Sequence, residues 1–174
     1  DSFEFAADSP ALGSVNAFRA WNPNPTDSNS PKYRALRVYQ DLLSFHEEDP
    51  DRSALLHCDL QRLRWAGEAA NPWPDRQARF DAALRSFMAA NANHPVSADA
   101  RIDVAGSLID LNHTKEAHQI ANAGAEAFPE HAFGKLCQNI VASLEEKEVF
   151  VMTPTLWTGS GEQITVSHAN VSHL

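Results

Sequence analysis

The sequence is short of basic residues and has no long apolar run. Its 174 residues hold 14 Lys and Arg against 23 Asp and Glu, a formal net charge of −9. Because phosphate groups are bound by clustered positive side chains, this balance argues against nucleic-acid and anionic-membrane partners. No stretch approaches the roughly 20 apolar residues of a membrane-spanning helix, so we expect no direct membrane insertion. The sequence opens at Asp1 without a signal peptide, and we expect it to be a piece of a larger protein.

The motifs of common enzyme and metal sites are also missing. The sequence contains no Gly-rich phosphate loop, no Cys-x-x-Cys and no Ser-His-Asp constellation. Its eight His are scattered; His113 and His118 lie five apart, about 140° round a helix, whereas zinc ligands on a helix share one face. The run "HEED" (46–49) is better explained as a solvated helix end. We therefore predict no catalytic, cofactor-binding or metal-binding residues, and no enzyme activity.

Helical signals dominate the middle of the chain. Ser30 is a suitable N-cap and Pro31 a suitable first helical residue. Later breaks fall where Pro disfavours helical geometry in the residue before it, as at Asp49-Pro50 and His94-Pro95. The apolar periodicity between these breaks predicts an all-α fold. The expected helices cover residues 31–47, 52–70, 75–92, 97–111, 114–128 and 130–147.

The apolar faces of these helices differ. Helices 31–47, 52–70 and 97–111 carry apolar residues on two faces, which is typical of a helix sandwiched between neighbours, and the other three are one-sided. In helix 31–47 one stripe contains Leu36 and Leu43, and the other consists of Val38, Leu42 and Phe45. Stacked helix pairs produce such a mixture.

A repeat of tetratricopeptide length lies in the second half. Pro95 and Pro129 are 34 residues apart, the period of such units. The stretch between them, "SADARIDVAGSLIDLNHTKEAHQIANAGAEAFP", resembles one unit, with small residues at Ala105, Ala117 and Gly124 where helices cross closely. The usual large apolar residues are replaced at two positions, one of them Arg101. The fold predicted is a tetratricopeptide-like α-solenoid, and an irregular helical bundle is the alternative.

The two ends of the chain have other patterns. Residues 1–30 are predicted to be an irregular segment whose aromatic side chains pin it to the helices, or else the tail of a preceding helical unit. Residues 31–147 form the predicted helical domain. In residues 148–174, alternation at 148–152 and 163–168 predicts two strands, separated by the Pro- and Gly-containing turn region "TPTLWTGSGEQ". An isolated hairpin is marginal in water, so we expect it to lie on the helices or to pair across a dimer.

The order of these features resembles the N-terminal region of bacterial alpha-2-macroglobulin-like proteins of the Bacteroidetes type. The matching stretches are "YRALRVYQDLLSFHEEDPDRSALLHCDLQRLRW", "EAHQIANAGAEAFPEHAFGKLCQNIVASLEEKEVFV" and "ITVSHANVSHL", the last containing Asn170-Val171. The resemblance covers residues 31–174 as many weak matches. It implies a helical segment that leads into the first macroglobulin β-sandwich of a cell-envelope protease inhibitor.

Some members of that family carry a thioester formed by a Cys and the Gln three residues later. "CDLQ" (58–61) has the spacing but Leu60 in place of Glu, and "SGEQ" (160–163) begins with a Ser that cannot form a thioester. We therefore expect neither to react. Cys58 and Cys137 are expected to be small buried apolar residues, although a disulfide between them stays possible in an oxidising compartment. Tyr33, Tyr39 and Trp65 are expected to pack in the core rather than to line a groove.

Three functional hypotheses remain. The first is a non-catalytic scaffold or docking module of an envelope alpha-2-macroglobulin-like protein. Its partners would be other domains of the parent chain and, through the parent, proteases or envelope proteins, with a dimer through the C-terminal strands. The second is a free-standing repeat adaptor that binds a peptide or protein. The third is an enzyme domain of unrecognised type, which the lack of a convergent polar cluster disfavours.

Overall fold

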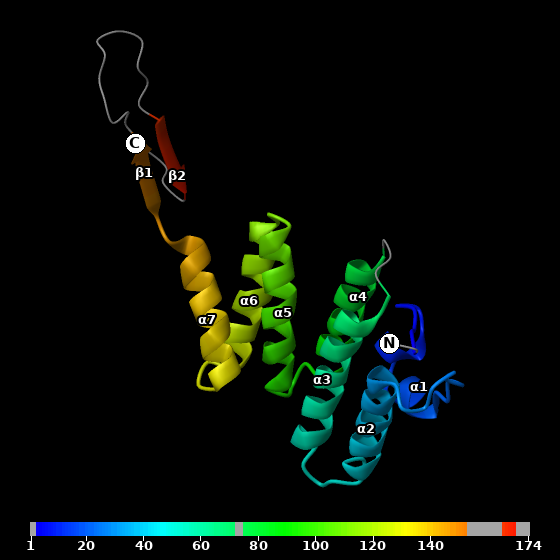
Figure 1. The fold of residues 1–174 in the computed structure, drawn as a ribbon. Helices are drawn as coiled ribbons and strands as arrows, with labels where there is room; N and C mark the ends of the chain where they lie inside the picture. The colour runs from blue at the N-terminus through cyan, green and yellow to red at the C-terminus, as the bar shows by residue number, and fades with distance from the viewer. Residues whose placement is uncertain (1–2, 72–74, 153–164, 170–174) are drawn as a thin grey trace.

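The protein is helical with a short C-terminal β segment, as predicted (Figure 1). The computed structural model describes residues 3–71, 75–152 and 165–169. All six predicted helices begin and end within two residues of the predicted bounds. These are α2 (Pro31–Phe45), α3 (Ser53–Ala69), α4 (Arg76–Ala90), α5 (Val96–Asp110), α6 (Thr114–Ala127) and α7 (Ala132–Glu145).

Local chemistry sets several of these boundaries. Ser30 Oγ accepts a hydrogen bond from the Tyr33 N–H at 3.5 Å, and Pro31 occupies the first turn of α2, as expected of an N-cap followed by Pro. Between α5 and α6 the chain turns at Asn112, whose φ is 61°. Asn is among the few residues that adopt this left-handed conformation at low cost.

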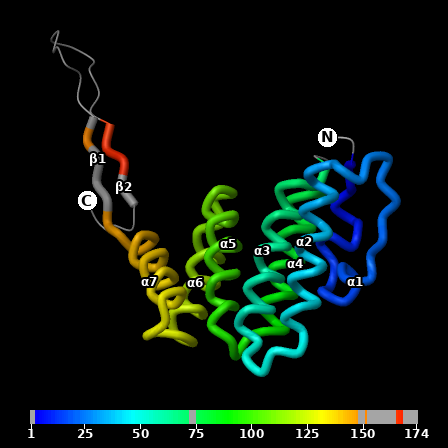
Figure 2. Tube along the Cα trace, turned by 60° about the horizontal axis from the view of Figure 1, so that its bottom comes forward, coloured from blue at the N-terminus to red at the C-terminus, as the bar shows by residue number. Residues whose placement is uncertain are grey.

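The helices form a row with the N-terminal segment at one end and the β segment at the other (Figures 1 and 2). Each helix from α2 to α7 packs against the next, and α5 also contacts α3 and α7. Leu36, Leu60 and Val104 are fully buried along this row. The alternate helices α3, α5 and α7 therefore contact one another in turn as well as their sequence neighbours.

The prediction that α2 is sandwiched is wrong. Its Leu36 and Leu43 stripe is buried, but Val38, Leu42 and Phe45 are 55%, 38% and 77% exposed. Within the described residues α2 packs mainly on α1 and α3. Among the described elements, no helix covers the second stripe.

Residues 3–21 pack onto α2 and α3 and are more regular than the sequence predicts. They include a 3₁₀ turn, η1 (Pro10–Leu12), and the short helix α1 (Val15–Ala20). The predicted aromatic anchoring is confirmed: the Phe3 ring lies 5.4 Å from Tyr33, and the Phe5 ring lies 5.4 Å from Trp65. Buried Gln40 also donates from Nε2 to the carbonyls of Phe18 and Trp21, at 2.8 and 2.6 Å. The sequence pattern alone does not reveal η1 and α1, because elements of three and six residues are too short to show an apolar periodicity.

Small residues lie where helices approach closely. Ala105 and Ala117 are fully buried, as predicted. A Cβ placed on Gly124 would lie 2.7 Å from Cys137 Sγ, and one on Gly134 would lie 1.8 Å from the Phe128 carbonyl oxygen. A larger residue at Gly124 would displace the Cys137 and Arg101 side chains, and one at Gly134 would displace backbone.

The β segment is an antiparallel hairpin of β1 (Glu148–Met152) and β2 (Thr165–Ala169), with Val151 opposite Val166. The strands pair chiefly with each other, and both views show them extending away from the helices beyond the end of α7. The expectation that the hairpin lies on the helical body is therefore wrong. Ile164, the turn region 153–163 and Asn170-Val171 lie outside the described residues.

Candidate functional site

Among the hollows on the surface of the described residues, two lie between packed segments of the helical body. The larger, of about 770 Å³, lies between the N-terminal segment, α3 and α4. Its lining includes the apolar side chains of Leu56, Leu63 and Phe87 and the ion pair of Asp59 with Arg62. This size falls within the range of small-molecule and peptide pockets, so the first question is whether its polar groups are free to bind.

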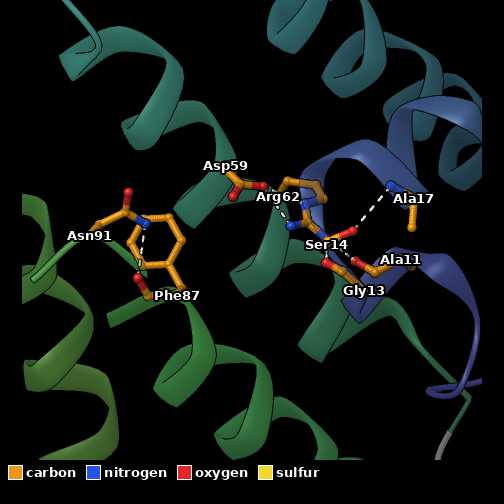
Figure 3. A network of polar contacts seen from close by, with 8 residues as sticks. All are labelled: Ala11, Gly13, Ser14, Ala17, Asp59, Arg62, Phe87 and Asn91. Atoms are coloured by element: carbon orange, nitrogen blue, oxygen red, sulfur yellow. Dashed lines mark hydrogen bonds and ion pairs between the residues drawn. The ribbon is translucent and has the colours of Figure 1, made fainter. Parts of the chain in front are cut away.

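Arg62 is fully committed to the protein itself (Figure 3). It is only 1% exposed. Its Nε and Nη2 both donate to Asp59 Oδ1, at 3.0 and 2.5 Å, and Nη1 donates to the carbonyls of Ala11 and Gly13, at 2.6 and 3.0 Å. The guanidinium carbon also lies 5.0 Å from the centre of the Phe18 ring. Arg62 therefore ties the N-terminal segment to α3.

Burial lowers the pKa of the Arg62 guanidinium, and the Asp59 carboxylate opposes that change. An arginine stays charged even so, and a buried charge is tolerated only when it is paired and hydrogen-bonded. Across the groove, Asn91 is also in use, since its Nδ2 donates to the Phe87 carbonyl at 2.9 Å, at the end of α4. The polar groups drawn in Figure 3 hold the fold together, so these groups of the groove are structural.

The smaller hollow has the opposite character. It is an apolar groove of about 300 Å³ between α5 and α7. Its lining is Ile102, Ile109, Leu136, Asn139, Ile140 and Ser143. Ile109 is 37% exposed and Leu136 is 48% exposed. We call this hollow the α5–α7 groove.

Gly106 lies on α5 between two residues that line the α5–α7 groove. It lies four residues after Ile102 and three before Ile109, so the three positions share one face of α5. A Cβ placed on Gly106 would meet no atom within 4 Å. Unlike Gly124 and Gly134, Gly106 therefore leaves open space.

An acidic row runs along α5 beside these positions. Asp99, Asp103 and Asp110 are spaced by four and seven residues and lie on one side of the helix. Arg64 of α3 bonds Asp103 at 2.7 Å and Asp99 at 2.8 Å, while Asp110 is exposed. Burial raises the pKa of Asp103, and the Arg64 hydrogen bond counters that change. With Arg64 included, the row keeps a net negative charge.

The residues considered from sequence are dispersed. Cys58 is half-buried and Cys137 is buried, both are free thiols, and Cys137 Sγ donates to the Ala98 carbonyl at 3.5 Å. Gln61 is exposed on α3. Residues 160–163 lie outside the described part of the chain. Tyr33, Tyr39 and Trp65 are partly buried and pack against the core, as predicted.

The histidines serve separate local contacts. His46 Nδ1 lies 2.7 Å from Asp49 Oδ2, and His118 Nε2 lies 2.7 Å from Glu145 Oε1. Across residues 3–71, 75–152 and 165–169, no group of three His, Cys, Asp or Glu is placed to hold a metal ion. The helices in these ranges include none with the length and apolar character needed to cross a membrane.

No family model, curated protein or solved structure matches this chain. Its function is therefore inferred from its fold and from the two hollows described above. Sequence reasoning missed the α5–α7 groove because it assigned both apolar faces of α5 to the core. It also missed Arg62, for which the only available signal was an Asp–Arg pair three apart amid the leucines of α3.

Proposed function

We propose that this chain is a non-catalytic docking module of a cell-envelope alpha-2-macroglobulin-like protein. The observation that carries the proposal is the β1–β2 hairpin, which follows α7 after two residues. Val151 and Val166 pair directly and are 53% and 43% exposed. Such a hairpin gains cover and edge partners as part of a larger sheet, as the family resemblance implies.

The helical row supports a tetratricopeptide-like arrangement within this proposal. Such repeats stack helix pairs so that each pair contacts the pairs next to it. Here α5 packs on α6 and α7, and buried small residues lie at Ala105, Ala117 and Gly124. The helices would then serve as a scaffold that presents surfaces to other domains of the parent chain and, through the parent, to proteases or envelope proteins.

The reading frame around this sequence in its gene tests the proposal. We expect a lipoprotein signal upstream and long β-sandwich patterning downstream. A reading frame with no β-rich continuation would refute the alpha-2-macroglobulin assignment. It would leave the second candidate, a free-standing adaptor that binds a peptide or protein, which the exposed α5–α7 groove favours.

Deletion of residues 148–174 tests the role of the hairpin. Because the strands pair chiefly with each other, the shortened protein should keep its helical circular dichroism signal and a cooperative urea transition. If the hairpin mediates a dimer, sedimentation should also show that the deletion yields a monomer. Loss of cooperative unfolding would mean that the strands belong to the helical core.

A further inference from the structure

We infer that the α5–α7 groove docks a basic amphipathic helix of a partner protein. The inference rests on the proposed docking role and names the surface and the chemistry that serve it. Ile109 and Leu136 are 37% and 48% exposed, and leaving such large apolar side chains in water costs free energy. Apolar groups gathered in a hollow mark interaction sites more often than single exposed ones.

The shape of the groove fits a helix. Two helices form its walls. The residues that line it repeat at helical spacing, at positions 102 and 109 of α5 and at positions 136, 140 and 143 of α7. Partner helices insert residues spaced by three, four and seven positions into such grooves. Helices pack at about 8–10 Å between axes, and the missing side chain at Gly106 leaves space for that approach.

The charge beside the groove selects a basic partner. No residue that lines the groove is charged. On α5, buried Asp99 and half-buried Asp103 share the single cation Arg64. The remaining negative charge is open to a partner chiefly at exposed Asp110, one residue after Ile109. A helix with leucines on one face and lysines beside them would place its cations along this acidic row. An acidic helix, or a second copy of this chain with its charge of −9, would meet repulsion.

The test uses a fluorescent peptide of leucine and lysine, about 14 residues or four turns long, with leucine along one face. Fluorescence anisotropy measures its binding to the full chain at two salt concentrations. We expect saturable binding that weakens as salt rises. A leucine–glutamate peptide of the same pattern should bind at least about tenfold more weakly, a difference of about 1.4 kcal/mol.

Matched variants locate the site. Leu136→Lys should weaken binding of the lysine peptide at least about tenfold, whereas Val38→Lys should change it by less than about twofold. Both replace a half-exposed aliphatic residue of a helix, and both add one positive charge. Leu136→Ala, which leaves the charge unchanged, should also weaken binding, and Asp110→Asn should reduce its salt dependence. Circular dichroism checks that each variant is folded.

Several results would overturn the inference. These are no binding by the folded protein, equal loss with Val38→Lys, or equal binding of the glutamate peptide. Self-association of the protein alone that Leu136→Lys abolishes would also overturn it, by assigning the groove to a second copy. Such a failure leaves the proposed parent protein untouched, because the reading frame of the gene tests that proposal separately.

Discussion

The same substitution at two helical glycines should change stability in opposite directions. Gly106 lies within α5 and Gly134 lies in the first turn of α7. In a helix interior, Gly→Ala ordinarily stabilises by about 0.8–1.0 kcal/mol, because glycine loses more backbone freedom on folding. At Gly106 the new methyl group meets no atom within 4 Å. Gly106→Ala should therefore raise the free energy of unfolding by about 1 kcal/mol.

At Gly134 the methyl group would lie 1.8 Å from the Phe128 carbonyl oxygen. Ordinary carbon–oxygen contacts begin near 3.3 Å, so the atoms must separate by roughly 1.5 Å. That oxygen belongs to the backbone and accepts a hydrogen bond from the His131 N–H at 3.1 Å. The backbone of this turn cannot move aside as easily as the end of a flexible side chain could. Overpacking costs about 1–3 kcal/mol and occasionally more, and we expect Gly134→Ala to lose about 2 kcal/mol or more.

Urea and thermal unfolding followed by far-ultraviolet circular dichroism measure both changes. For a chain of this size, 1 kcal/mol shifts the melting temperature by about 2–4 °C. Gly106→Ala should melt about 2–4 °C higher than the unsubstituted protein, and Gly134→Ala about 4–8 °C lower. If Gly134→Ala is as stable as the unsubstituted protein, the close approach of the 128–131 turn to α7 is wrong. A destabilised Gly106→Ala would mean that α5 is covered there.

Arg62→Met should cost about 3–5 kcal/mol by leaving the Asp59 carboxylate buried and unpaired, and should expose residues 3–21 to limited proteolysis. Adding Asp59→Leu should restore much of that loss in urea unfolding, and no restoration would contradict the buried pair. Cys137 should resist iodoacetamide in the native state, since burial raises the pKa of its thiol, and rapid labelling without urea would show that α7 is not packed as described. The Arg19 hydrogen bond lowers the pKa of Glu47, so stability from this pair should be present at neutral pH and be lost as pH falls through that lowered value. Glu47→Gln should remove that part of the acid dependence in pH-dependent melting, and an unchanged profile would mean that the pair contributes nothing.

The sequence predicted the helices well because their signals are local. Proline breaks and apolar periodicity placed α2 to α6 within two residues of their bounds, and Ser30 acts as the expected cap. What covers each face depends on contacts between distant segments, and there the prediction failed. Val38 and Phe45 repeat with the same period as buried residues of α2, so periodicity alone could not reveal their exposure.

The same limit applied to the candidate sites. Arg62 bonds carbonyls about 50 positions earlier in the chain, and nothing in the local sequence indicates those acceptors. The α5–α7 groove likewise depends on how α5 and α7 are placed relative to each other. In the sequence, Ile109 has the apolar character and helical spacing of a core residue. Only the arrangement of the helices leaves it at the surface.

The direct passage from α7 into β1 has a mechanical consequence. Only Glu146 and Lys147 separate the helix from the strand, so tension on the hairpin reaches the last turn of α7 with little slack. α7 packs on α5 and α6 along its length, and a pull at its end loads those contacts one after another rather than together. A terminal helix loaded in this way peels off at low force, before the helices behind it. Stretching the protein between its ends should therefore unzip the β1–β2 pairing from its Glu148–Ala169 end and then release α7, exposing Cys137 while α2 to α4 stay folded.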